Sequence, residues 1–334
     1  MVTFVVVVPA YNEGYSIERC IKGVIEASEL CREEFELKAV VVCVNGCTDN
    51  TETIVDNLCS RYPVVKKNSL PVNNYRAALE ESFSYVGERY PDSMVVKLDA
   101  DSVPRANSFA ILLGELAHHP HLLIAGGHPV VTMPHGLPWW RRILAKVLAV
   151  RSFFPQGEVS ALRVDEYHPL AHSDQQAVGP AFETRSKIYF HGRFWAARHA
   201  HLLHLPQRQL GDDVYLTARL YHDFGPGVIR VRYDANCQFE PNYTLVRHFL
   251  TYRRINADLH RLDDDPELNW YVRTSRTRLD WTYIKRLSLA DQACFLAYYL
   301  ISSVEHIMFS IFPYRETDWV YSSKHPPIKL DRAE

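Results

Sequence analysis

The sequence predicts an α/β fold of the doubly wound type, with a mainly parallel sheet flanked by helices and a helical C-terminal extension. Residues 4–8, 37–44 and 94–98 are apolar runs typical of strands that are covered on both faces. Helical patterns lie between these runs, starting at Ser16, near Asp49 and at Asn73. Alternation of strand and helix favours parallel strands joined by crossover helices.

The remaining elements are spaced less regularly along the chain. We expect strands at 64–66, 122–132 and 227–239, and helices at 104–118, 139–150, 214–221, 243–262 and 289–312. Residues 134–171 lose the α/β rhythm, and residues 263–285 resemble a loop with a short helix. We therefore predict a catalytic domain over residues 1–240 and a mostly helical extension over residues 241–334 that packs on it.

Composition excludes several classes of protein. The 334 residues are 47% hydrophobic with a formal net charge of -2, which fits a globular enzyme and gives no basic field for nucleic acid. The seven cysteines contain no Cys-x-x-Cys pair, so we expect reduced thiols. The first residues enter a strand without a signal-peptide pattern, and a cytoplasmic location is expected.

Two carboxylates follow the strand at 94–98. Asp99 and Asp101 are two residues apart, so in an extended segment both side chains point the same way, past the carboxyl end of the strand. Ligands bind at that edge of open α/β sheets, and paired carboxylates suit a hard divalent cation. The motif alone also fits a solvated acidic turn.

Four blocks, taken in order, resemble the inverting family-2 glycosyltransferases with the nucleotide-sugar-binding fold called GT-A. They are Val7-Val8-Pro9-Ala10-Tyr11-Asn12-Glu13, Val44-Asn45-Gly46-Cys47-Thr48-Asp49-Asn50-Thr51, Asp99-Ala100-Asp101, and Asp212-Asp213-Val214-Tyr215-Leu216-Thr217-Ala218-Arg219-Leu220. The similarity covers residues 4–220 and fades after about residue 255. It implies that the chain transfers a sugar from a nucleotide-diphosphate donor, with UDP as the favoured nucleotide.

The resemblance also implies roles for individual residues. Asp101, aided by Asp99, is expected to bind Mn²⁺ or Mg²⁺, and Asp213 to act as the base beside Asp212. The alternative for the second pair is a helix N-cap. Expected contacts to the nucleotide sugar come from seven residues: Pro9, Tyr11, Glu13, Asn45, Arg76, Asp99 and Arg254.

The chain departs from the family pattern at two places. Val44 stands where the family often has an aspartate that contacts the nucleobase, and Asn45 is the polar residue left beside it. Processive members carry Gln-x-x-Arg-Trp, but residues 251–255 retain only the arginine, which we take as Arg254. We therefore expect transfer of a single sugar to a small-molecule or lipid-linked hydroxyl.

Two helical stretches bear on membrane contact. Residues 139–150 place Trp139 and Trp140 opposite basic residues, a pattern that fits a membrane surface or an amphipathic core helix. Residues 289–312 are strongly apolar, but Asp291 and Glu305 leave an uncharged run shorter than a span of about 17–25 residues. We expect a buried or interfacial helix there, or a homodimer face, with peripheral membrane contact.

Two other functions compete with glycosyl transfer. A nucleotidyltransferase on a related sheet is disfavoured, because no Gly-rich basic phosphate loop follows the first strand. A non-catalytic nucleotide- or glycan-binding module is disfavoured by the presence of all four aspartates at 99, 101, 212 and 213.

Overall fold

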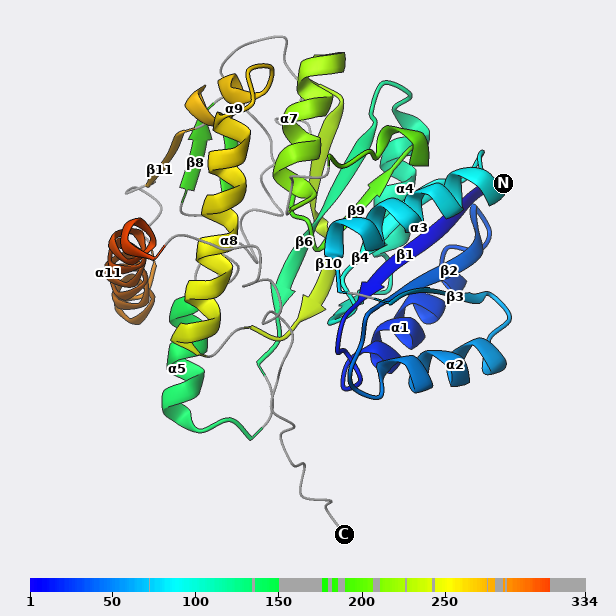
Figure 1. Cartoon of the computed structure of the whole chain (residues 1–334), viewed down its shortest axis with the longest axis horizontal. Helices are drawn as coiled ribbons and strands as arrows, with labels where there is room; N and C mark the ends of the chain where they lie inside the picture. Colours follow the sequence, from blue (N-terminus) through cyan, green and yellow to red (C-terminus); the bar gives the residue numbers. More distant parts are fainter. Residues whose placement is uncertain are drawn as a thin grey trace.

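A computed structural model of the chain describes residues 1–71, 73–133, 136–149, 176–179, 182–185, 190–206, 211–225, 227–241, 244–274, 276–279, 285 and 287–312. Eight strands form its central sheet: β1 (Val2–Ala10), β2 (Phe35–Asn45), β3 (Val65–Leu70), β4 (Met94–Leu98), β5 (Ser102–Pro104), β6 (Ile124–Val131), β9 (Phe194–Ala197) and β10 (Ile229–Phe239). Their order across the sheet is β3-β2-β1-β4-β9-β6-β10-β5. The predicted α/β class is confirmed (Figure 1).

Helices cover both faces of this sheet (Figure 1). The described helices are α1 (Ile17–Glu29), α2 (Thr51–Arg61), α3 (Tyr75–Arg89), α4 (Ser108–His118), α5 (Trp139–Leu148), α7 (Asp213–Phe224), α8 (Leu245–Asp263), α9 (Asn269–Thr274) and α11 (Leu289–Ile311). Of these, α11 lies beside the sheet and packs on α5 and α8. A small separate sheet has the order β11-β8-β7, with β7 at Gln176–Gly179, β8 at Phe182–Arg185 and β11 at Arg276–Leu279.

Strand direction divides the large sheet. β3, β2, β1 and β4 are all parallel, as βαβ connections require. β9 then runs antiparallel between β4 and β6, and β10 returns parallel to β6. Because β9 is reversed, its first residue, Phe194, pairs with Leu98, the last residue of β4. The segment before β9 therefore lies at the carboxyl end of β4.

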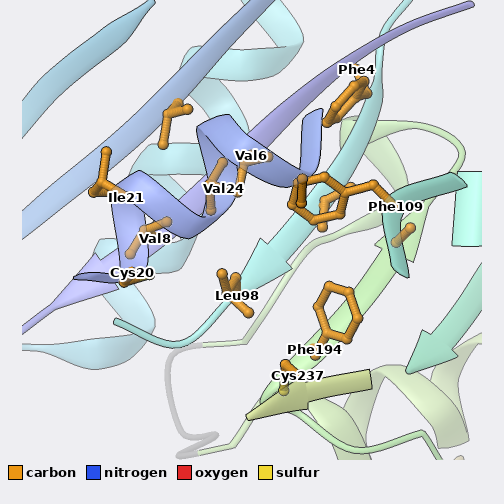
Figure 2. Close-up of a cluster of buried hydrophobic side chains, with 14 of the residues drawn as sticks. Phe4, Val6, Val8, Cys20, Ile21, Val24, Leu98, Phe109, Phe194 and Cys237 are labelled. Carbon is orange, nitrogen blue, oxygen red and sulfur yellow. The ribbon is translucent and has the colours of Figure 1, made fainter. Parts of the chain in front are cut away.

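The core has a layer on each face of the sheet. Along β1, Phe4, Val6 and Val8 pack against α1 and α4, while the alternate residues pack in the opposite layer with α3 and α7. Figure 2 shows the first layer, where Cys20, Ile21 and Val24 of α1 meet Phe109 of α4 and Phe194 of β9. Both faces of β1 are buried, which explains its unbroken apolar run.

Glycines in β6 admit two aromatic side chains. A Cβ on Gly126 would lie 2.6 Å from the Cβ of Phe190, and one on Gly127 would lie 2.3 Å from the ring of Phe194. The pair that interrupts this strand in the sequence therefore lets the segment leading into β9 pack closely on the sheet.

Two predicted helix starts are wrong. The predicted helix at 104–118 begins at Ser108, because Ser102–Pro104 forms the edge strand β5 beside β10. The helix predicted to open at Asn73 is capped by Asn74, whose side chain accepts a hydrogen bond from the Ala77 amide.

The C-terminal helices are joined to the first part of the chain. Leu262, Leu268 and Tyr271 lie in the same buried cluster as α7 and the sheet. Lys146 of α5 forms an ion pair with Asp291 of α11, and these two helices pack together. A domain boundary at residue 240 stays a prediction.

The two helices that bear on membrane contact both expose apolar residues. On α5, Ala145, Val147 and Leu148 are buried, whereas Trp139 and Trp140 are 74% and 49% exposed, so the predicted single apolar face is divided between protein and solvent. The alternative of a buried helix at 289–312 is wrong. An 18-residue window of α11 has mean hydropathy 1.4 and is only 11% buried, and by length and composition this helix could cross a membrane.

Candidate active site

Five of the predicted site residues meet at the carboxyl ends of β1 and β4: Glu13, Asp99, Asp101, Asp212 and Asp213. The segment His191–Arg193 lies there because β9 is antiparallel to β4, and the Asp99 amide donates a hydrogen bond of 3.0 Å to the Arg193 carbonyl. Asp212 and Asp213 reach the same place from the start of α7. The chain therefore assembles the site from three segments that are distant in sequence.

Asp99 and Asp101 hold a guanidinium group between them. Nη1 of Arg193 contacts Oδ1 of Asp101 directly and lies 3.7 Å from Oδ2 of Asp99. The hydroxyl of Ser102 also donates to Asp101 at 3.1 Å. The carboxylates thus converge on one cation, as their spacing predicts. Although burial alone would lower the pKa of Arg193, Asp101 and Asp99 raise it, and the guanidinium stays charged.

A second cation, Lys97, lies behind this pair. Its side chain is only 1% exposed, and its ammonium donates to Oδ1 of Asp99 at 2.5 Å and to the Gly192 carbonyl. It also lies 3.8 Å from Oδ2 of Asp212. Burial opposes the charge on Lys97, but Asp212 and Asp99 raise its pKa well above the usual value. Lys97 therefore links the two aspartate pairs electrostatically.

Asp212 is buried and fixed. One carboxylate oxygen accepts a hydrogen bond of 3.2 Å from the Trp195 indole, and the other accepts one of 3.3 Å from the Tyr75 hydroxyl. Burial raises the pKa of Asp212 to about 6, with Lys97 opposing that rise and Asp213 adding to it. The Asp212 side chain makes no bond that caps α7, so the capping alternative does not account for it.

Asp213 is less buried than Asp212. Its Oδ2 accepts a hydrogen bond of 2.9 Å from the Gly192 amide, and its Oδ1 accepts one of 2.8 Å from the Val214 amide. A Cβ on residue 192 would lie 2.9 Å from Oδ2 of Asp213, so a larger residue there would have to displace the carboxylate. Asp213 is thus oriented and also partly accessible to an acceptor hydroxyl, as a base must be.

The turn after β1 brings Glu13 to the metal motif. Burial and the neighbouring Asp101 raise the pKa of Glu13 to about 8, although its hydrogen bond from Ser16 opposes that rise. The turn is fixed by Asn12, which has a positive φ of 54° and accepts a bond of 2.7 Å from the Thr48 amide. Pro9 is buried near the end of β1 and Tyr11 is half-buried in the turn that follows, and their roles as donor contacts stay predictions.

The other predicted donor contacts lie in different surroundings. Asn45 is buried, and its amide bonds to Asn73 at 2.9 Å and to the Asn74 backbone at 2.8 Å, so it fixes the start of α3. Arg76 is half-buried in the first turn of α3, next to Tyr75, and Arg254 is half-buried on α8. The roles of Asn45, Arg76 and Arg254 as donor contacts stay predictions.

The residues fit a divalent ion bound together with a substrate. Across the described parts of the chain, no group of three His, Cys, Asp or Glu side chains is placed to form an all-protein metal cage. Asp99 and Asp101 nevertheless converge on a cation, the Arg193 guanidinium. Mg²⁺ in particular is usually held by one or two carboxylates plus substrate phosphates, which is the donor set this site offers.

Sequence reasoning missed four residues of the site. Lys97 had a readable signal: it is the charged residue in an apolar strand, and it stands two before Asp99 and so points the same way. Arg193 and Trp195 lie in an aromatic-rich stretch with no motif to mark them, and Tyr75 lies in an ordinary helix start. Their roles follow from strand order rather than from spacing.

Comparison with known proteins agrees with this geometry. Residues 5–170 match the sequence model of glycosyl transferase family 2. This stretch is a family-2 glycosyltransferase domain, and the chain is a glycosyltransferase. No curated protein matches it in a sequence search.

Three solved structures are similar to this chain at low identity. A mannosyltransferase from Pyrobaculum calidifontis, in complex with GDP-mannose and Mn²⁺, is 16% identical with a TM-score of 0.53, over 93% of this chain and 76% of its own. TarS 1–349 of S. aureus is 15% identical with a TM-score of 0.47, over 96% and 78% of the two chains. Glucosyl-3-phosphoglycerate synthase of M. tuberculosis is 21% identical with a TM-score of 0.46, over 78% and 80%.

Proposed function

We propose that this glycosyltransferase moves one sugar from a nucleoside-diphosphate sugar to an acceptor hydroxyl, with inversion at the anomeric carbon and with the help of Mn²⁺ or Mg²⁺. The observation that carries the proposal is the segment Gly192–Arg193, which joins the two aspartate pairs. Its amide holds Asp213, and its guanidinium meets Asp99 and Asp101. A cation-binding pair beside a positioned carboxylate is what displacement of a diphosphate by a hydroxyl requires.

Each group has a distinct task in this proposal. When bound, a divalent ion supplies positive charge that stabilises the leaving diphosphate. Asp213 accepts the proton of the acceptor hydroxyl, which attacks the face of the sugar opposite the leaving group and so inverts the centre. Asp212, which Tyr75 and Trp195 hold in place, orients the sugar or the acceptor. Lys97 holds Asp99 and Asp212 at a fixed separation.

The nucleotide of the donor is either UDP or GDP in this proposal. The sequence resemblance favours UDP, while the Pyrobaculum mannosyltransferase is described with GDP-mannose and Mn²⁺. A panel of UDP- and GDP-linked sugars tests this choice. The family match favours glycosyl transfer over nucleotidyl transfer or binding alone. Release of free nucleoside diphosphate supports the proposal, whereas release of pyrophosphate contradicts it.

The base assignment is tested by paired variants. We expect Asp213→Asn to lower kcat by about 10²–10⁴-fold while calorimetric donor binding stays close to wild type, since a positioned base contributes roughly that factor. Asp212→Asn should act more on KM. Asp223→Asn, on the exposed side of the same helix, is the control. Near-normal kcat in Asp213→Asn combined with loss in Asp212→Asn would move the role to Asp212.

We also propose that the acceptor is lipid-linked and that α5 and α11 contact a lipid surface peripherally. On α11, four apolar residues are each at least 60% exposed and follow one another at spacings of four or seven, so they form one stripe: Leu296, Leu300, Ile307 and Ile311. An exposed stripe of this kind marks an interaction surface.

The composition of α5 favours lipid over a second copy of the chain as the partner of this surface. Its exposed tryptophans, Trp139 and Trp140, lie next to Arg141 and Arg142, and the helix carries no acidic residue. Tryptophan with arginine suits the headgroup region of an anionic bilayer. A homodimer through α11 is the competing outcome.

A further inference from the structure

Arg193 is built into the place where a metal ion is expected. Its Nη1 contacts Asp101, lies 3.4 Å from the Ser102 hydroxyl and lies 3.7 Å from Asp99. Its guanidinium carbon lies 4.2 Å from the centre of the Phe239 ring, a cation–π arrangement. The side chain is 21% exposed and comes from the segment that the Asp99 amide fixes. These contacts hold the guanidinium of Arg193 in a defined position.

The two cations of the site differ in their freedom to move. Lys97 is 1% exposed and is shared between Asp99 and Asp212, so it stays in position when ligands bind. Arg193 is 21% exposed, and its closest partner is Asp101, the residue expected to bind the metal. A divalent ion and this guanidinium would bind the same two carboxylates, so binding of either cation weakens binding of the other.

We propose that Arg193 competes with the divalent ion for the Asp99–Asp101 pair, so that the free enzyme binds metal weakly. The inference rests on the proposed function, which places the metal at this pair. A guanidinium binds phosphate oxygens as well as it binds carboxylates. The diphosphate of the donor therefore draws Arg193 off Asp101, and metal and donor bind together more tightly than either binds alone.

The test is Mn²⁺ binding without any acceptor, measured by calorimetry and by the electron paramagnetic resonance signal of free Mn²⁺. We expect Arg193→Met to bind Mn²⁺ about tenfold or more tightly than wild type in the absence of nucleotide, since removal of a unit charge a few ångströms away acts strongly on a cation site. Arg193→Gln is a second neutral variant for the case in which the methionine variant fails to fold. Arg219→Met, which removes an exposed arginine on α7, should leave the affinity unchanged.

A second readout separates competition from a structural role. Addition of UDP or GDP should tighten Mn²⁺ binding in wild type by a larger factor than in Arg193→Met, because the variant has no guanidinium to displace. Equal or weaker Mn²⁺ binding in both neutral variants, with thermal unfolding showing that they fold, overturns the inference. Absence of Mn²⁺ binding in wild type and variants, even with nucleotide, overturns both this inference and the metal site in the proposed function.

Discussion

Replacing Lys97 with methionine should destabilise the fold, because it removes the cation that the buried Asp212 and the half-buried Asp99 share. Methionine is unbranched and nearly as long as lysine, so the change is mainly one of charge. Asp212 has a side chain that is 5% exposed and would lose its cation at 3.8 Å, and Asp99 would lose a 2.5 Å contact. Removing one partner of a buried ion pair costs about 3–5 kcal/mol.

The expected change in melting temperature follows from chain length. At roughly 2.1 cal/mol/K per residue, unfolding of 334 residues carries an entropy of about 0.7 kcal/mol/K. A loss of about 3–5 kcal/mol then lowers Tm by roughly 4–7 °C. The loss is limited because Asp212, whose pKa is already raised to about 6, can take up a proton when Lys97 is gone.

The assay is thermal unfolding at pH 7.5, with a double variant to isolate the pair. Lys38→Met, which removes an exposed lysine of β2 paired with Glu36, should change Tm little. Lys97→Met combined with Asp212→Asn should be less unstable than the sum of the single variants, because the neutral amide no longer needs a cation. The reasoning would be refuted if Lys97→Met lowered Tm by less than about 1 °C, or if the destabilisation of the double variant equalled the sum of the two single variants.

The remaining predictions concern pH and membranes. His128 lies beside Tyr233 and near His191, and burial lowers its pKa to about 4. Its neutral form therefore contributes stability that is fully present above the unfolded-state pKa, near 6.5, and is lost as the pH falls toward 4. Urea unfolding at pH 7 and pH 4.5 measures how much free energy of unfolding is lost on acidification. This loss should be smaller by up to about 3 kcal/mol in His128→Gln than in wild type, whereas the exposed control His118→Gln should lose as much as wild type. Equal losses in the two variants would contradict this prediction. Wild type should sediment with vesicles of phosphatidylcholine and phosphatidylserine at low salt and release at high salt, whereas the double variant Trp139→Ser/Trp140→Ser should bind several-fold less. Phe224→Ser, which changes an exposed aromatic residue on α7, is the control; a need for detergent at any salt, or dimerisation through α11 without vesicle binding, would contradict the lipid surface.

The parts of the site that lie at the ends of parallel strands could be read from the sequence. Asp99 and Asp101 follow a buried strand, but they converge through the turn that the Ser102 amide closes on the Asp99 carbonyl and not through the two-residue period of a strand. Glu13 follows the first strand in the same way. These positions depend on local pattern and on the general rule for sheet edges, so they need no knowledge of strand order.

The contacts that connect the two aspartate pairs could not be read in this way. Arg193 reaches Asp101 because β9 inserts antiparallel between β4 and β6, and no local pattern in residues 190–197 encodes that position. The exposure of α11 could not be predicted either, since an apolar helix has the same sequence pattern whether or not other parts of the protein cover it. Tertiary neighbours decide both cases.

The central position of β9 has a consequence for folding during synthesis. β1 to β4 are complete by residue 98 and β1 covers one edge of β4, but the neighbour of its other edge begins at Phe194. At a translation rate of about 5–20 residues per second, the emerging chain therefore carries an unpaired strand edge in the middle of its future sheet for roughly 5–20 s. Such an edge is open to pairing with other chains, so the first half of this enzyme is expected to depend on chaperones until the strand that completes its active site has left the ribosome.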